Sequence, residues 1–220
     1  MEKVILFGNQ SVAKEVFHCL KYYSDYEVAG FVVDKEYVDK DHLLGLPLFP
    51  FEGAQNVFPP DTYKMFIAIG YVQNNKLRAD RYLQAKKLGY KLINFISPRS
   101  IIFPESVVGE NCFIGHFTSI SPNAKIGNDV VIGNGCDIAH DVIISDHCFI
   151  SSNVTISGGV NIGSYCYFAT GSKIRNKINI GKECVIGAGA TLLENAEDKS
   201  VYLGEPATLL PISSDKLPLG

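Results

Sequence analysis

The stretch IGNDVVIGNGCDIAHDVII, residues 126–144, repeats an isoleucine every sixth position. The same spacing runs without an insertion from Ile102 to Leu192, in sixteen consecutive hexads of which thirteen begin with Ile. A small or β-branched residue stands four positions after the lead residue, as at Ala124 and Val130. The lead residues are Ile102, Val108, Ile114, Ile120, Ile126, Ile132, Ile138, Ile144, Ile150, Ile156, Ile162, Phe168, Ile174, Ile180, Ile186 and Leu192.

A period of six residues cannot keep apolar side chains on one face of an α-helix, because the helix turns every 3.6 residues. Short strands joined by turns can do so. If each hexad forms one side of a three-sided coil, residues 18 positions apart stack at about the strand spacing of ~4.8 Å. The lead residue and the small residue four positions later then fill the interior, and Gly127-Asn128 supplies a corner turn. The sequence therefore predicts a parallel β-helix of about five coils.

Five of the six cysteines fall in the small interior position of this repeat. An even number of cysteines can indicate a disulfide framework, but such frameworks belong mainly to small secreted domains. No C-x-x-C motif is present to indicate zinc. We interpret the five as compact core residues and expect none of the six to be catalytic. The five are Cys112, Cys136, Cys148, Cys166 and Cys184.

The composition is that of an ordinary globular chain, with 46% hydrophobic and 20% charged residues among 220 and a net charge of −3. This balance lacks the basic footprint of a nucleic-acid-binding protein. Apolar runs such as Val4–Phe7 are far too short to span a bilayer, and the N-terminus has no signal-peptide pattern. We therefore expect a cytoplasmic protein that neither binds nucleic acid nor inserts into a membrane.

The first 98 residues alternate strand-like and helix-like segments, which predicts a parallel α/β sheet. Its first turn, Gly8–Ala13, has one glycine where a dinucleotide-binding fingerprint has three, so a nicotinamide cofactor is not expected. The predicted segments are strands at 4–7, 26–33, 66–70 and 92–96 and helices at 11–22 and 75–88, with 35–63 mostly irregular.

The hexads, over about residues 100–210, resemble the hexapeptide-repeat, left-handed parallel β-helix acyltransferases. With a truncated Rossmann-like unit ahead of them, they resemble the branch of sialic-acid O-acetyltransferase-like and bacillosamine-pathway nucleotide-sugar N-acetyltransferase-like enzymes. The left hand comes from the resemblance, because general rules favour right-handed crossovers. The resemblance implies a Rossmann-like nucleotide-sugar-binding domain at 1–98 and a β-helix acyltransferase domain with a C-terminal tail at 99–220. The front site would be lined by Gly8, Asn9, Gln10, Asp34 and Gly70, although each glycine is also consistent with a simple strand end.

His140 is the candidate base for acyl transfer. The family's catalytic histidine occurs in a His–acidic pair that matches His140-Asp141, in which Asp141 either orients the imidazole or is simply solvated. Adding 18 to 140 gives Gly158, so the repeat alone places the imidazole about 5 Å from a glycine backbone. An N–H there can approach a thioester carbonyl, and stabilise the oxyanion that develops on it, without side-chain obstruction. Some members carry a second histidine nine residues later, but here Phe149 stands there, which favours a single-base mechanism.

The resemblance places coenzyme A along the later coils and the C-terminal exit. The tail motif Gly204-Glu205-Pro206-Ala207 matches the family's acyl-CoA wall. The basic cluster Lys173, Arg175 and Lys177 suits the CoA phosphates, or it is an ordinary solvated face. The residues assigned to the cofactor are Gly159, Gly171, Lys173, Arg175, Ala188, Gly189, Gly204 and Pro206.

Family members form trimers with the active site between adjacent subunits, so the resemblance implies a homotrimer. The interpretation is an acetyl-CoA-dependent N-acetyltransferase for the amino group of a nucleotide-linked deoxy sugar in bacterial surface-glycan or lipopolysaccharide synthesis. A sugar O-acetyltransferase acting on sialic acid or a related sugar stays open, because the same base and thioester slot serve amine and hydroxyl. A β-helix that only binds nucleotide sugar or acts as a scaffold also stays open. No metal is expected, because His116 stacks over Asn134 and His140 over Pro122, which brings no ligands together.

Overall fold

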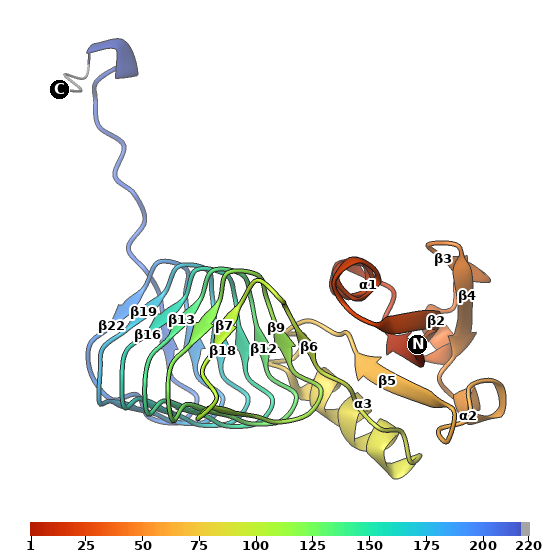
Figure 1. The fold of residues 1–220 in the computed structure, drawn as a ribbon. Coiled ribbons are helices and arrows are strands. Elements are labelled where there is room, and N and C mark those ends of the chain that lie inside the picture. The colour runs from red at the N-terminus through yellow and green to blue at the C-terminus, as the bar shows by residue number, and fades with distance from the viewer. Residues whose placement is uncertain (217–220) are drawn as a thin grey trace.

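A five-stranded sheet forms the front of the chain in the computed structural model, which describes residues 1–216 (Figure 1). Its strand order is β3-β4-β2-β1-β5, parallel except for β3 against β4. Strand β1, between β2 and β5, is fully buried on both faces from Val4 to Leu6, as expected for a parallel sheet covered by helices. The elements are β1 (Glu2–Phe7), α1 (Ser11–Tyr23), β2 (Tyr26–Val33), η1 (Lys35–Tyr37), β3 (His42–Leu43), β4 (Leu46–Pro50), α2 (Ala54–Val57), β5 (Tyr63–Ile67) and α3 (Lys76–Lys87).

Two predictions for this half were wrong in detail. The segment 35–63 is not mostly irregular, because β4 pairs in parallel with β2. Its prolines lack N–H groups, but Leu48 and Phe51 donate to the carbonyl oxygens of Asp41 and Val33 and hold the strand in place. The strand predicted at 66–70 lies earlier along the chain, at Tyr63–Ile67, so Ile69 and Gly70 leave the sheet.

The predicted three-sided coil is confirmed. Strands β7 to β22 are sixteen two-residue strands, each ending on one of the sixteen lead residues, and partners in the register are 18 positions apart. Sheet I consists of β6 (Phe95–Ile96), β9 (Phe113–Ile114), β12 (Val131–Ile132), β15 (Phe149–Ile150), β18 (Tyr167–Phe168), β21 (Val185–Ile186) and β23 (Val201–Tyr202). Sheet II consists of β7 (Ile101–Ile102), β10 (Ser119–Ile120), β13 (Asp137–Ile138), β16 (Thr155–Ile156), β19 (Lys173–Ile174) and β22 (Thr191–Leu192). Sheet III consists of β8 (Val107–Val108), β11 (Lys125–Ile126), β14 (Ile143–Ile144), β17 (Asn161–Ile162) and β20 (Asn179–Ile180).

The β-helix begins one strand earlier than the first predicted hexad. Phe95–Ile96 pairs with β9 of sheet I, and Ile96 stands six positions before Ile102. The segment 92–96 is therefore not a single last strand of the front sheet, since only Leu92 bridges to Met65 there. A tail follows β23 and leads away from the last coil to the turn η2 (Ser214–Lys216) (Figure 1).

The interior of the β-helix confirms the two predicted inward positions, because lead residues and the residues four positions later are buried. The cysteines in the small position are free, and each Sγ contacts a backbone carbonyl of the next coil, as Cys136 does with Ser151 at 3.0 Å. Thr118 uses its Oγ1 in the same way toward Gly133. Burial raises the pKa of Cys112 to about 12 and of Cys136 to about 11, so these thiols stay protonated at neutral pH.

Helix α3 and the end of β5 join the two parts through a buried polar network. The Arg78 side chain is fully buried, and its Nε donates to Asp129 Oδ1 at 3.1 Å. Asn111 Oδ1 accepts from the Ile67 N–H at 2.8 Å, and Asn75 Nδ2 donates to the Cys166 carbonyl oxygen. These partners lie at the corner between sheets III and I, which fixes the front domain against one edge of the β-helix. No helix within residues 1–216 is long and apolar enough to cross a membrane.

Candidate active site

His140 and Asp141 form the corner between β13 of sheet II and β14 of sheet III. The imidazole Nδ1 lies 2.8 Å from Asp141 Oδ2, and the two side chains are 67% and 57% exposed. Asp141 has a left-handed backbone with φ of +58°, a conformation that Asp and Asn tolerate well. Its other oxygen, Oδ1, accepts from Asn123 Nδ2 at 3.2 Å. The hydrogen bonds from His140 and then Asn123 hold the pKa of the Asp141 carboxyl below its ordinary value.

The hydrogen bond to Asp141 determines which imidazole nitrogen of His140 carries the proton. An ionised carboxylate only accepts hydrogen bonds, so the neutral imidazole keeps its proton on Nδ1 and leaves a lone pair on Nε2. Within residues 1–216, Nε2 has no hydrogen-bond partner. A neutral imidazole with an exposed Nε2 has the form required of a general base.

Gly158 lies against this imidazole, as the 18-residue stacking predicts. A Cβ added to Gly158 would lie 2.7 Å from both Cε1 and Nε2 of His140, so any side chain there would displace the ring. The Gly158 carbonyl accepts from the Lys177 N–H at 3.0 Å, whereas its own N–H has no partner in the described chain. One backbone donor is therefore available next to the candidate base.

The residues predicted for coenzyme A fall into two groups along the edges of sheet II. Gly159 and Arg175 belong to the same corner as His140, in the two coils that follow it. Gly159 has φ of +69°, and Arg175 Nη1 donates to the Leu193 carbonyl oxygen at 3.2 Å. Lys173 is exposed on β19 beside them. This first group shares one side of the β-helix with His140.

The second group lies at the other corner, between sheets I and II. Gly171 and Gly189 take its left-handed turn position, with φ of +73° and +66°. Gly204 packs on Ala188 so closely that a Cβ on Gly204 would overlap the Ala188 carbonyl oxygen. Pro206 follows in the exposed tail. Within one chain, the structure does not bring these residues to His140, because sheet II separates the two corners.

All five residues predicted for the nucleotide sugar line one cavity of about 500 Å³ at the carboxyl ends of β1 and β2. The first turn of α1 opens here, with no side-chain cap on its N-terminus and no acidic residue. Free N–H groups at a helix N-terminus favour a phosphate. The residues shared by the prediction and the cavity are Gly8, Asn9, Gln10, Asp34 and Gly70.

Asp34 lines this cavity with its carboxylate already paired. Arg81 of α3 donates from Nε to Oδ1 at 2.8 Å and from Nη2 to Oδ2 at 2.9 Å. The Asp34 hydrogen bond raises the pKa of the Arg81 guanidinium. Nothing in the sequence points to Arg81, because this pair spans 47 residues and forms only when the fold brings α3 to the residue that follows β2.

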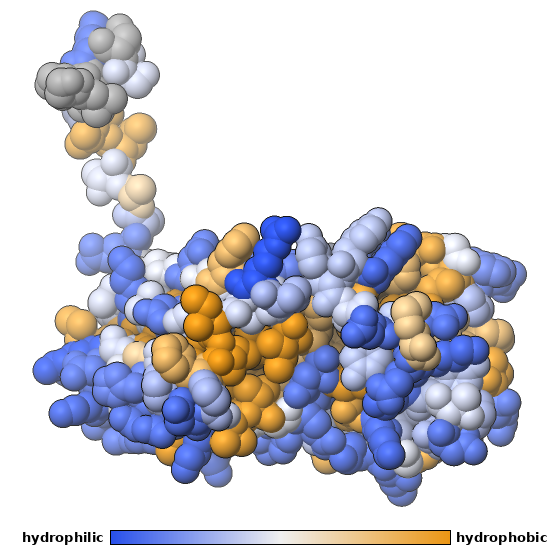
Figure 2. Space-filling model, viewed as in Figure 1, coloured by the Kyte–Doolittle hydropathy of each residue, from blue (hydrophilic) through white to orange (hydrophobic). Residues whose placement is uncertain are grey.

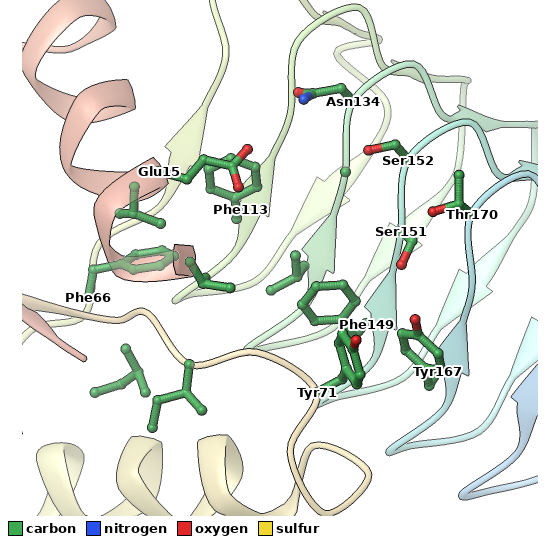
Figure 3. A pocket seen from close by; sticks show the side chains of 16 residues that line it. Glu15, Phe66, Tyr71, Phe113, Asn134, Phe149, Ser151, Ser152, Tyr167 and Thr170 are labelled. Carbon is green, nitrogen blue, oxygen red and sulfur yellow. The ribbon is translucent and has the colours of Figure 1, made fainter. Parts of the chain in front are cut away.

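A second cavity, of about 300 Å³, lies between the front domain and sheet I (Figure 3). We call it the interdomain cavity. Its lining comes from α1, from the segment after β5 and from the strands and corners of sheet I. It shares Val12, Ile69 and Tyr71 with the 500 Å³ cavity at the ends of β1 and β2, which we call the front cavity. No three His, Cys, Asp or Glu side chains in residues 1–216 are grouped as a metal site would require.

Family models match both halves of the chain. The PglD N-terminal domain model matches residues 3–85, and the bacterial transferase hexapeptide model of six repeats matches residues 105–140 and 123–158. The hexapeptide repeat of succinyl-transferase matches residues 177–205. The chain is a hexapeptide-repeat protein with a PglD-type N-terminal domain. No curated protein sequence matches it.

Three solved structures resemble this hexapeptide-repeat protein over nearly its whole length. PerB from Caulobacter crescentus, in complex with CoA and GDP-perosamine, has a TM-score of 0.84 and 24% identity, covering 94% of this chain and 97% of that one. The acetyltransferase domain of PglB from Neisseria gonorrhoeae has 0.81 and 22%, covering 96% and 100%. WeeI from Acinetobacter baumannii has 0.80 and 23%, covering 96% and 100%. The likeness establishes the fold, an α/β domain followed by a left-handed β-helix.

Sequence reasoning about this hexapeptide-repeat protein missed the interdomain cavity entirely. In the sequence, Phe149 stands out only as the position where some family members carry a second histidine, yet its ring lies in the cavity beside Tyr71. Tyr71 follows β5 and gives no repeat signal, since it lies outside the hexads. The 18-residue stacking does relate Phe149 to Tyr167, so an aromatic pair on one face of sheet I was available from the sequence.

Proposed function

We propose that this protein is an acetyl-CoA-dependent N-acetyltransferase for the amino group of a nucleotide-linked deoxy sugar, acting in the cytoplasm in bacterial surface-glycan synthesis. The observation that carries the proposal is the exposed His140–Asp141 pair, whose unpartnered Nε2 lies against Gly158. The structural relatives support the substrate classes: PerB was solved with CoA and GDP-perosamine, and the PglB domain with acetyl coenzyme A.

The reaction requires three groups that the corner supplies. The sugar amine attacks the thioester carbonyl carbon, and Nε2 of His140 accepts the proton that the nitrogen loses. The Gly158 N–H donates to the oxyanion of the tetrahedral intermediate. The C–S bond then breaks, and the imidazolium returns its proton to the CoA thiolate. Asp141 remains ionised and stabilises the transient imidazolium.

A homotrimer completes the coenzyme A site in this proposal. Sheet II separates the His140 corner from Gly171 and Gly189 within one chain, whereas a groove between two copies can join one corner of each. Hydrophobic side chains gather on the β-helix face in Figure 2, and the first coil exposes Ile101 and Val107. Exposed apolar groups of this kind favour association.

The test is product analysis with purified protein, acetyl-CoA and a panel of nucleotide-linked sugars. Each amino sugar is paired with the analogue that carries a hydroxyl at the same carbon. We expect a new amide in the amino-sugar reactions and an equimolar release of CoA. Acetylation of hydroxyls alone would replace the proposal by the O-acetyltransferase alternative, and sugar binding without any transfer would replace it by a binding protein.

A further inference from the structure

Asp141 belongs to a column of turn residues at the corner between sheets II and III. The column consists of Asn123, Asp141, Gly159 and Lys177, which stand 18 positions apart and all have a left-handed backbone, with φ between +58° and +69°. From Asp141 onward, each of them donates its N–H to the preceding coil, as Asp141 does to the Pro122 carbonyl oxygen at 3.2 Å. These backbone bonds hold neighbouring turn residues one coil apart, at the strand spacing of ~4.8 Å.

The two neighbours of Asp141 in this column differ. In the coil before it, Asn123 Nδ2 donates to Asp141 Oδ1 at 3.2 Å. In the coil after it, Gly159 has no side chain, and Lys177, one coil further on, forms no ion pair with Asp141. Across residues 1–216, Asn123 is therefore the only side chain besides His140 that bonds the Asp141 carboxylate.

This second bond restricts a carboxylate that packing leaves free. The Asp141 side chain is 57% exposed, and the terminal torsion of an Asp side chain is broad and roughly two-fold. An unrestrained carboxylate would rotate away from the imidazole. Bonds to both oxygens, from His140 to Oδ2 and from Asn123 to Oδ1, fix this torsion. The imidazole then keeps its proton on Nδ1 and its lone pair on Nε2.

We propose that Asn123 is a positioning residue for acyl transfer, which holds the Asp141 carboxylate in the orientation that fixes the tautomer of His140. The inference rests on the proposed function. Asn123 bonds Asp141 rather than the imidazole, so its effect on the reaction passes through Asp141 alone. The effect therefore belongs to kcat, while KM for acetyl-CoA and for the sugar stays nearly unchanged.

The test is a double-mutant cycle with CoA release as the measurement. Asn123→Gly removes the amide and keeps a residue suited to the left-handed backbone. We expect kcat to fall about threefold to fivefold, with both KM values within about twofold of wild type. In the Asp141→Gly background no carboxylate remains to be oriented, so Asn123→Gly should change kcat by less than about 1.5-fold.

Two further variants separate positioning from an effect on the backbone. Lys199→Gly changes another exposed turn residue with a left-handed backbone, at the corner between sheets III and I, and should leave kcat unchanged. Asn123→Asp keeps the shape of the side chain but places a second carboxylate beside Asp141, which opposes ionisation of both. It should therefore lower kcat more than Asn123→Gly does.

Nitrogen NMR of histidine-labelled protein gives a measurement that does not depend on turnover. In wild type the His140 imidazole should be mainly protonated on Nδ1, and Asn123→Gly should increase the share protonated on Nε2. An equal fall in kcat in the wild-type and Asp141→Gly backgrounds, or an unchanged kcat and tautomer in Asn123→Gly, would overturn the positioning role and leave the proposed function intact. Wild type that transfers acetyl to no amino sugar would overturn the proposed function and this inference with it.

Discussion

Two His–Asp pairs in this protein have the same hydrogen bond and opposite surroundings. In both, the imidazole Nδ1 lies 2.8 Å from a carboxylate Oδ2. The side chains of His140 and Asp141 are 67% and 57% exposed, whereas those of His147 and Asp129 are 10% and 0% exposed. The two histidines are only seven residues apart in the sequence, on neighbouring corners of one coil.

The difference shows that access, rather than the hydrogen bond, separates a candidate base from a structural histidine. His147 stacks on Tyr165 at 5.0 Å and meets Tyr82 edge-on at 5.5 Å, so no substrate reaches its ring. Asp129 also accepts from Arg78 and Asn111, which ties the front domain to the β-helix. His140 has only Gly158 and solvent beside Nε2.

The largest expected effect is on kcat, and it distinguishes the His140–Asp141 pair from the His147–Asp129 pair. His140→Asn should lower kcat by about 10²–10⁴-fold, because a general base contributes that much. The fold should be unaffected, since the side chain is exposed. CoA release measures turnover, and thermal melting checks the fold. Turnover within threefold of wild type would remove His140 from the mechanism.

Asp129→Ala should have the largest effect on stability. It leaves the buried Arg78 charge without its carboxylate, and breaking such a buried pair costs about 3–5 kcal/mol. The free energy of unfolding from urea titration measures the loss. Asp141→Asn, which neutralises the exposed carboxylate and keeps a residue that tolerates the left-handed backbone, is the matched control and should unfold like wild type. Equal stabilities of the two variants would contradict the contrast between the pairs.

His147→Asn should act on stability and leave the chemistry unchanged. The variant loses two ring contacts and a hydrogen bond to Asp129, so we expect about 1–3 kcal/mol less stability. At a temperature where the variant is fully folded, its kcat should lie within twofold of wild type. A large fall in kcat there would mean that both histidines serve the reaction.

Asp141→Asn should have a smaller effect on activity than the loss of His140. Asn keeps a hydrogen-bond acceptor and suits the left-handed backbone at this position, but it removes the charge that stabilises the imidazolium. We expect kcat to fall roughly tenfold, less than the ~10⁴-fold that a buried carboxylate contributes in a Ser-His-Asp triad. An unchanged kcat would leave Asp141 a solvated neighbour of His140.

The smallest expected effect is a pH-dependent change in thermal stability. Partial burial opposes ionisation of Glu110, but hydrogen bonds from Lys86 and Tyr82 outweigh it and hold the pKa of the carboxyl below its ordinary value. A lowered folded-state pKa stabilises the fold above the ordinary pKa of 4.5, and this contribution is lost as the pH falls through the lowered value. Glu110→Gln should therefore lower Tm by no more than about 2 °C at pH 7 and by less at pH 3. A pH-independent difference in Tm would contradict this assignment.

Repeat spacing predicted the β-helix accurately because each hexad contributes the same two inward side chains. The stacking of residues 18 positions apart also placed Gly158 against His140, a contact fixed by coil geometry alone. The front domain was harder, because its strand pairing is non-local and the prolines near β4 suggested a loop. The residues assigned to coenzyme A lie at two different corners of sheet II, and their role stays a prediction.

By itself, the sequence determined which residues face the interior of the β-helix, since a strict six-residue period admits one register. It also brought together five of the residues that line the front cavity, because the carboxyl ends of parallel strands meet at one edge. Only the tertiary structure decided that His147 is sealed and His140 open. That distinction depends on where α3 packs, because Tyr82 of this helix covers the His147 ring. The position of α3 rests in turn on the ion pair between Arg78 and Asp129, which lie 51 residues apart in the sequence. No local pattern encodes such a contact, because the packing of two separate parts creates it.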